Sequence, residues 1–125
     1  AQTYEVGPFT LQFFGGSHAP IAEGIETPPN YGVFVNHHLY YPGDSFFVPA
    51  GISVPTLALP ISAPWLDFAR TREFLAQVRP QLAFPTHDGI LSEDGKELAE
   101  RMVCGFAQSN GIVYKRLDGQ SIKLR

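Results

Sequence analysis

The sequence has one cysteine, few basic residues and no long apolar run. The single cysteine, Cys104, excludes a disulfide within the chain and is typical of a protein from a reducing compartment. The 125 residues include only 9 Lys and Arg and carry a formal net charge of -3, so no basic stripe for a nucleic-acid backbone is expected. No apolar run reaches the roughly 18 residues of a membrane span, and no secretory signal opens the chain. These absences favour a cytoplasmic protein that binds neither nucleic acid nor membrane.

The motifs of several common catalytic mechanisms are also absent. No Gly-x-Ser-x-Gly elbow presents a serine nucleophile, and no glycine-rich phosphate loop of standard spacing occurs. Cys104 lies in an apolar helical pattern, where a thiol stays protonated, so we expect an inert core residue of the last helix. The hydrophobic content of 44% and charged content of 17% predict one folded domain over residues 1–125. The start at Ala1, directly before a strand-like run, suggests that the chain was cut from something longer.

Apolar runs and turn residues predict strands and two covering helices. We expect strands at residues 4–14 with a kink at Gly7-Pro8, at 31–35 and 39–41 as a hairpin, at 56–59 and at 82–84. The run at 56–59 suits a strand buried on both faces. A closing hairpin is expected to join residues 112–114 to 121–124.

Two segments have helical periodicity. Residues 66–78 form one amphipathic helix, and a second is expected to begin at an N-cap Ser92 and to bury Leu98, Met102 and Phe106. The fold class is therefore α/β or α+β, with one mixed sheet and helices mainly on one face. In such sheets the loops at strand ends collect the chemistry.

Three short motifs each end a strand-like run with a side chain that can bind a metal. They are Gly15-Gly16-Ser17-His18, Tyr41-Pro42-Gly43-Asp44-Ser45 and Pro85-Thr86-His87-Asp88-Gly89. Imidazole nitrogens and carboxylate oxygens are the donors of catalytic metal sites. We therefore take His18, Asp44 and His87 as candidate ligands, and Asp44, which can bridge two cations, as the candidate catalytic residue.

Each candidate has a plainer interpretation. His18 and His87 can be loop histidines bonded to carbonyls, and Asp44 can be a turn residue that accepts backbone N–H groups. We also expect a substrate pocket near Ser62, Trp65 and Asp88. Trp65 more often packs under a helix N-terminus in such a position, Ser62 could instead cap the helix, and Asp88 could orient His87 or cap its turn.

Longer stretches of the sequence resemble a known family. The matching segments are Gly16-Ser17-His18-Ala19, Tyr31-Gly32-Val33, Tyr41-Pro42-Gly43-Asp44-Ser45, Leu59-Pro60-Ile61-Ser62-Ala63-Pro64-Trp65 and Pro85-Thr86-His87-Asp88-Gly89-Ile90-Leu91-Ser92. Together and in this order they resemble the C-terminal half of the metallo-β-lactamase fold, in particular the ascorbate-6-phosphate lactonase-like metal-dependent hydrolases. The resemblance runs over residues 6–102 and implies half of an αββα sandwich.

The resemblance also implies a site with one or two divalent metals, zinc or manganese. His18 then completes the histidines of the first metal, Asp44 bridges, and His87 binds the second metal, in an enzyme that hydrolyses an ester, lactone or phosphoester. The family's His-x-His-x-Asp-His loop has no counterpart in this sequence. Since a hydrolytic metal needs enough protein ligands, we expect this chain alone to bind metal weakly or not at all and to be inactive.

Two other hypotheses remain. A half-fold module would act through its exposed sheet in protein interaction or in self-association, as a homodimer for example. Alternatively, the His and Asp residues are purely structural in a small domain. The presence of a strand followed by His-x-His-x-Asp-His upstream of Ala1 in the open reading frame would favour the enzyme.

Overall fold

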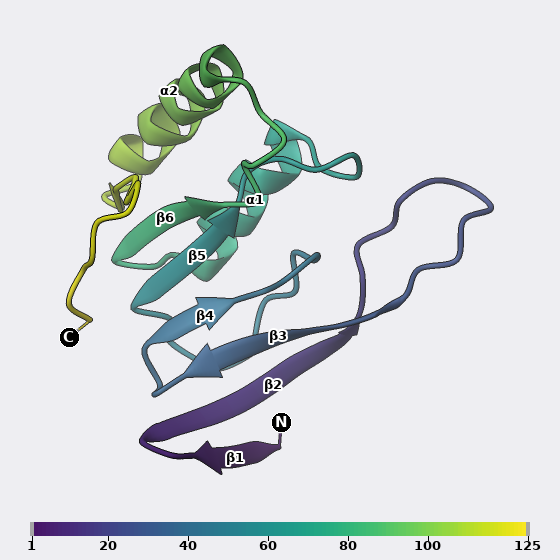
Figure 1. The fold of residues 1–125 in the computed structure, drawn as a ribbon, viewed down its shortest axis with the longest axis vertical. Coiled ribbons are helices and arrows are strands. Elements are labelled where there is room, and N and C mark those ends of the chain that lie inside the picture. The colour runs from purple at the N-terminus through teal and green to yellow at the C-terminus, as the bar shows by residue number, and fades with distance from the viewer. Residues whose placement is uncertain (1, 125) are drawn as a thin grey trace.

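The computed structural model describes residues 2–124, and these form a mixed seven-stranded sheet with two helices (Figure 1). The sheet follows chain order from β1 to β7. The strands are β1 (Thr3–Val6), β2 (Phe9–Ser17), β3 (Pro29–Val35), β4 (Leu39–Tyr41), β5 (Thr56–Pro60), β6 (Leu82–Thr86) and β7 (Val113–Tyr114). The helices are α1 (Phe68–Val78) and α2 (Glu93–Ser109). Neither helix is long and apolar enough to cross a membrane.

The first four strands are antiparallel neighbours, and one turn among them differs from our prediction. Gly7-Pro8, expected as a kink in one long strand, connects β1 and β2 as a two-residue hairpin in which Val6 pairs with Phe9. Gly7 has φ 58°, the left-handed backbone that a primed hairpin turn needs at its first central position, and Pro8 suits the second. The chain therefore reverses where proline would otherwise interrupt a ladder.

The β3–β4 hairpin and the buried β5 strand were predicted correctly. Asn36 and His37 have φ values of 50° and 54° in the turn, and Asn36 Oδ1 accepts a hydrogen bond of 2.8 Å from Thr10 N. All five residues of β5 are buried. It pairs in parallel with β4 and β6, and β6 with β7, so α1 and α2 are the crossover helices of two β-α-β units.

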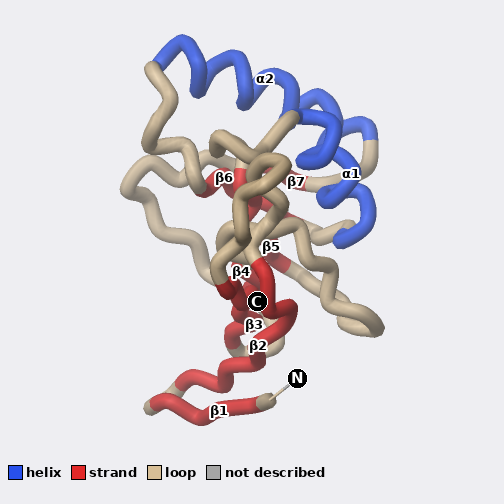
Figure 2. The backbone as a smooth tube through the Cα atoms, turned by 90° about the vertical axis from the view of Figure 1, so that its right-hand side faces the viewer, coloured by secondary structure: helices blue, strands red, loops and turns tan. Residues whose placement is uncertain are grey.

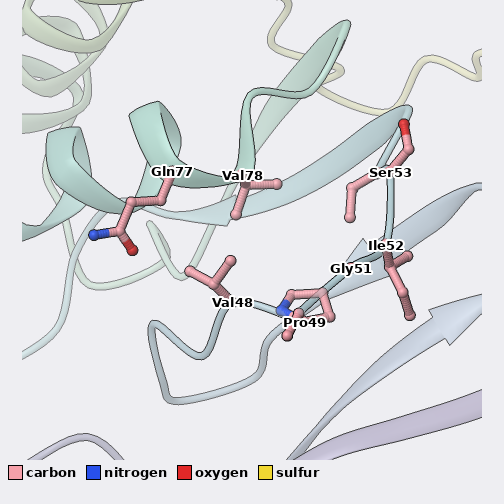
Figure 3. Close-up of a pocket in the computed structure, with 9 residues that line it drawn as sticks. Val48, Pro49, Gly51, Ile52, Ser53, Gln77 and Val78 are labelled. Carbon is pink, nitrogen blue, oxygen red and sulfur yellow. The ribbon is translucent and has the colours of Figure 1, made fainter.

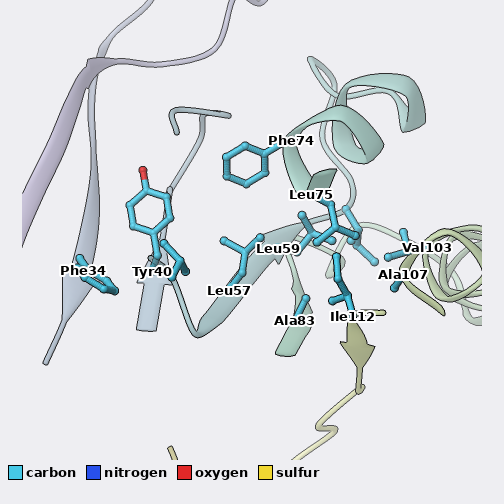
Figure 4. Close-up of a cluster of buried hydrophobic side chains, with 12 residues drawn as sticks. Phe34, Tyr40, Leu57, Leu59, Phe74, Leu75, Ala83, Val103, Ala107 and Ile112 are labelled. Atoms are coloured by element: carbon cyan, nitrogen blue, oxygen red, sulfur yellow. The ribbon is translucent and has the colours of Figure 1, made fainter. Parts of the chain in front are cut away.

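The hydrophobic core lies between the sheet and the two helices, which cover the same face (Figure 2). Phe74 and Leu75 of α1 and Ala107 of α2 pack toward the strand residues Leu57 and Leu59 (Figure 4). The predicted fold class, α+β with a mixed sheet and helices on one face, is confirmed. The core extends from Phe34 and Tyr40 at one end to Ile112 at the other.

The buried face of α2 differs from the predicted one. Ser92 is the N-cap as expected, but Leu98 and Met102 are 52% and 41% exposed, whereas Val103 and Ala107 are buried. A four-residue spacing advances by more than one turn of a 3.6-residue helix, so the Leu98-Met102-Phe106 stripe drifts around the helix and only its last member reaches the core. Cys104 is half-buried and lies outside the core cluster.

The predicted closing hairpin is also wrong within the described residues. β7 pairs in parallel with β6 through Val113 N to Gln81 O and Lys115 N to Ala83 O, both 3.0 Å. Residues 121–124 form no strand. β7 is the last strand of the sheet, and none of residues 115–124 forms a strand beside it, so the turn at Asp118-Gly119 does not build a hairpin.

The helix-free face of the sheet is apolar along its first four strands. The cross-strand register places ten residues on this face, which we call the apolar sheet face. They are Tyr4, Val6, Phe9, Leu11, Phe13, Tyr31, Val33, Val35, Leu39 and Tyr41. Glu5, Thr10 and Gln12 project on the opposite side, where β1 and β2 extend beyond the helices (Figure 2). In an isolated sheet with helices on one face, the helix-free face would carry polar side chains. Here the helix-free face carries apolar ones.

Candidate metal centre

The three predicted ligands lie at one edge of the sheet. β2 is antiparallel to β3, β3 is antiparallel to β4, and β4, β5 and β6 are parallel, so β2, β4, β5 and β6 all end at the same edge. His18 follows β2, Asp44 follows β4, Trp65 follows β5 and His87 follows β6. The topology therefore brings together side chains that are up to 69 positions apart in the sequence, from His18 to His87.

Asp44 lies between the two imidazoles. Its Oδ1 is 2.9 Å from His87 Nε2, and its Oδ2 is 3.8 Å from His18 Nε2. The His18 side chain is nearly buried, and those of His87 and Asp44 are partly exposed. Each carboxylate oxygen thus faces one histidine nitrogen.

The ring of His18 is oriented by a main-chain carbonyl. His18 Nδ1 lies 2.7 Å from Ala19 O, and since a carbonyl only accepts, Nδ1 carries the proton. The other ring nitrogen, Nε2, is the one that faces Asp44. Metal-binding histidines commonly use such a bond on the second nitrogen to fix the tautomer and the ring.

The loop that presents Asp44 is fixed by Asn30, a residue that the sequence reasoning missed. Asn30 Nδ2 donates to Pro42 O, and Asn30 Oδ1 accepts from Asp44 N, both at 2.9 Å. Gly43 between them has φ 70°, and a Cβ there would lie 2.5 Å from Asn30 Oδ1. Ala19 N also donates to Asp44 O at 2.7 Å, so the loop is tied to the one that carries His18.

Trp65 forms a wall against both histidines. Its ring is edge-on to His18 at 5.6 Å and to His87 at 6.3 Å between centroids, and it also packs against Phe46 at 5.3 Å. The indole is buried. It therefore limits how the two imidazoles can turn.

Ser62 and Asp88 lie apart from the three candidate ligands. Asp67, not Ser62, is the N-cap of α1, with its carboxylate accepting from Arg70 N at 2.8 Å. Ser62 lines an apolar cavity of about 270 Å³ between α1 and α2. The Asp88 carboxylate accepts from Arg116 at 2.5 Å instead of from His87.

The donor set fits a metal site only in part. Within residues 2–124, no group of three or more His, Cys, Asp and Glu side chains is arranged to hold a metal ion by itself. His18, Asp44 and His87 converge in a row with Asp44 in the middle, so further ligands would have to face that row. Their chemistry, two imidazoles whose Nε2 atoms face one carboxylate, is that of ligands to a divalent metal.

A second cavity is unrelated to this cluster. It encloses about 280 Å³ between residues 48–54 and the end of α1, lined by Val48, Ile52, Gln77 and Val78 among others (Figure 3). None of its lining residues titrates near neutral pH. It offers no group for acid–base or metal chemistry.

No protein-family model matches the chain. A curated relative, Protein Rv0786c of Mycobacterium tuberculosis, is 35% identical over a 92-residue alignment that covers 70% of this chain and 43% of that protein. The chain thus spans less than half of the length of this relative.

Solved structures of similar fold are metal-dependent hydrolases and a β-hydroxylase by name. Igni18, a metallo hydrolase of Ignicoccus hospitalis, matches all of this chain and 57% of its own at TM-score 0.63 and 12% identity. A metal-dependent hydrolase of Parabacteroides distasonis matches 92% of this chain and 54% of its own at TM-score 0.58 and 12% identity. A mutant of CmlA β-hydroxylase matches 93% and 31% at TM-score 0.62 and 14% identity.

These similarities establish the fold. The chain shares a metallo-hydrolase-type fold with these proteins, and its mixed sheet with two helices is consistent with half of a metallo-hydrolase sandwich. The names of the two hydrolases state that those proteins depend on a metal.

Proposed function

We propose that the chain is the C-terminal part of a metal-dependent hydrolase that cleaves an ester, a lactone or a phosphoester. The observation that carries this proposal is the convergence of His18, Asp44 and His87 at one edge of a metallo-hydrolase-type sheet. Nothing in the local sequence of any one loop requires this convergence, because each loop follows a different strand. The ascorbate-6-phosphate lactonase-like branch is the proposed subfamily.

In this proposal the Nε2 atoms of His18 and His87 and the carboxylate of Asp44 would help to hold one or two divalent ions, zinc or manganese. A metal held there would supply Lewis-acid activation of water for hydrolysis. The chain's own contribution is positional. Ala19 O holds the His18 tautomer, Asn30 holds the Asp44 backbone, and Trp65 restricts both imidazoles.

The remaining ligands would come from polypeptide outside this sequence, in a His-x-His-x-Asp-His loop. Two observations support this. The chain spans 43% of its curated relative and 57% of Igni18. Within residues 2–124, no group of three or more His, Cys, Asp and Glu side chains is arranged to hold a metal by itself. We therefore expect the isolated chain to be inactive.

The test uses the complete polypeptide with His18, Asp44 or His87 replaced by Ala. Removing a ligand should cost more than the roughly 10–100-fold that loss of a ligand's supporting partner costs, so metal affinity should fall by more than about 100-fold. Hydrolysis of a panel of ester, lactone and phosphoester substrates should fall with it. Bound metal is measured by elemental analysis and activity by initial rates.

His37→Ala is the matched control, since His37 is exposed at the tip of the β3–β4 hairpin. It should retain both metal and activity. Unchanged metal content and activity in all three ligand variants would establish the purely structural account of these residues.

A second candidate function is favoured by a different observation. The apolar sheet face exposes Tyr4, Val6, Phe9 and Tyr31 on the side that carries no helix. We propose that, in the absence of further polypeptide, this face mediates self-association of the chain.

A further inference from the structure

His87 has an unusual backbone for a candidate ligand. Its φ is 64°, in the left-handed region that residues with a side chain rarely adopt. Such conformations persist only where the surrounding structure holds them, and they cluster at functional sites. The contacts of the neighbouring residues show what holds this one.

The residue after His87 is anchored at two points. The Asp88 carboxylate accepts a hydrogen bond from Arg116 Nη1 at 2.5 Å, and its main-chain carbonyl accepts from Leu91 N at 3.0 Å. Asp88 is therefore fixed both by side chain and by backbone. Since His87 and Asp88 share a peptide plane, fixing Asp88 also restricts the backbone of His87.

Arg116 is itself anchored from the other side. Its Nε donates to Glu100 Oε2 of α2 at 2.9 Å, and Nη1 lies 3.5 Å from Asp118 Oδ1. The Arg116 side chain is only 16% exposed. Burial disfavours the charged guanidinium, but the hydrogen bonds to Asp88 and Glu100 outweigh this and raise the pKa of Arg116, so it stays charged.

The backbone of Arg116 is also tied to the strand that leads to His87. Arg116 follows β7, and Lys115 N beside it donates to Ala83 O of β6 at 3.0 Å. The rigid fork of an arginine, unlike a lysine, can hold two carboxylates in fixed directions at once. Arg116 thus connects β7, α2 and the His87 loop.

The Arg116 bond also determines where the Asp88 carboxylate points. Asp88 is next to His87 in the chain and carries a carboxylate, which is a metal ligand by type. The bond to Arg116 directs that carboxylate away from Asp44 and His18. Without the guanidinium, the Asp88 side chain would be free to turn. The negative charges of Asp88 and Glu100 would also repel each other, because no positive charge would lie between them.

We infer that Arg116 is a positioning residue for His87: it holds the His87 backbone in the left-handed conformation through Asp88 and keeps the Asp88 carboxylate out of the ligand set. The expected effect of Arg116 on metal binding rests on the proposed function. The expected effect of Arg116 on the His87 backbone does not.

The first experiment needs no metal. Amide hydrogen exchange is measured by NMR on the metal-free complete polypeptide, for wild type, Arg116→Met, Asp88→Ala and Glu100→Ala. Exchange of the Leu91 amide, which bonds to Asp88 O, should accelerate by about 10-fold or more in Arg116→Met and Asp88→Ala, as expected of local opening. Glu100→Ala removes the other Arg116 bond but leaves the bond to Asp88, so it should accelerate Leu91 exchange less than Arg116→Met does. Unchanged Leu91 exchange in Arg116→Met would overturn the inference.

The second experiment titrates the same proteins with cobalt(II), whose visible absorption reports the ligand geometry. Arg116→Met and Asp88→Ala should each weaken cobalt binding about 10–100-fold and change the spectrum, and the double variant should be no worse than either. Arg116→Lys should restore part of the wild-type spectrum, and Glu100→Ala should change it less than Arg116→Met does.

The outcomes separate the two proposals. Cobalt binding that is lost in His87→Ala but fully kept in Arg116→Met would overturn the role of Arg116 and leave the metal site standing. If His87→Ala itself binds cobalt like wild type, the proposed metal site fails, and the Leu91 exchange result still decides whether Arg116 holds the loop.

Discussion

At the scale of single residues, Gly32 determines whether the core beneath the Asp44 loop can form. Tyr40 is fully buried and donates to Phe47 O at 2.8 Å, which fixes the loop shortly after Asp44. A Cβ on Gly32 would lie 2.8 Å from Tyr40 Cζ and 2.9 Å from Cε1. Because the ring is enclosed and its hydroxyl is engaged, it has little room to move, so Gly32→Ala should lower the free energy of unfolding by about 1–3 kcal/mol.

Urea denaturation measures this, and Gly105→Ala is the matched control. Gly105 is within α2, and a Cβ added there would meet no atom within 4 Å, so alanine should raise stability by about 0.5–1 kcal/mol. Opposite signs for the same substitution would isolate the effect of Tyr40. A Gly32→Ala variant as stable as wild type would show that the Tyr40 ring yields, and the account of the loop anchor would be wrong.

The candidate ligands were predictable from sequence because each has a signal in the residues just before it. His18, Asp44 and His87 each follow an apolar run and a glycine or proline turn, and a common edge of the sheet then follows from topology. Asn30 and Arg116 were not predictable, since Asn30 acts on a loop 14 residues away and Arg116 on Asp88, 28 residues away. Nothing near either residue in the sequence signals such a partner.

At the scale of elements, one N-cap residue, Ser92, stabilises the start of α2. Ser92 Oγ accepts from Gly95 N at 3.1 Å, and Glu93 and Asp94 in the first turn face the positive end of the helix dipole. Ser92→Ala should destabilise the protein by about 0.5–2 kcal/mol, since it leaves a first-turn N–H without its acceptor. Thermal or urea unfolding measures the change.

Ser109→Ala provides the control at the other end of the same helix. Its hydroxyl donates to Gly105 O at 3.0 Å, a carbonyl within α2, so the bond does not satisfy a terminal group of the helix. Alanine is also the better helix former. Stability should change by less than about 0.5 kcal/mol. Equal losses in both variants would mean that the Ser92 hydroxyl stabilises α2 no more than any helix hydroxyl does.

The elements with strong periodicity or strong turn signals were predicted, and those with long-range pairing were not. The Asn36-His37-His38 turn, the buried β5 and both helices follow from local pattern. The Gly7-Pro8 hairpin was missed because the flanking apolar residues continue as if in one strand. β7 was assigned to the wrong partner because a parallel neighbour, β6, lies across a helix in the sequence and leaves no turn between the strands.

At the scale of the whole molecule, the two faces of the sheet have different roles. The helices and the core occupy one face, and neither helix covers the apolar sheet face (Figures 1 and 2). Contiguous exposed apolar surface marks an interface, and in a two-layer sheet packing that surface would be internal. The residues that cover it in a complete polypeptide would also stand beside the edge where His18, Asp44 and His87 converge. The same polypeptide would then complete both the hydrophobic core and the ligand set.

For the isolated 125-residue chain we propose that a second copy covers this face. Light scattering coupled to size exclusion should report a dimer that dissociates on dilution. Tyr4→Lys and Tyr31→Lys place charges on the face, Tyr31 being 61% exposed, and the double variant should be monomeric. Leu98→Lys changes an apolar residue that is also exposed, but on α2, and should leave the dimer intact. A clean monomer of the wild-type chain at high concentration, or equal disruption by Leu98→Lys, would reject association through the apolar sheet face.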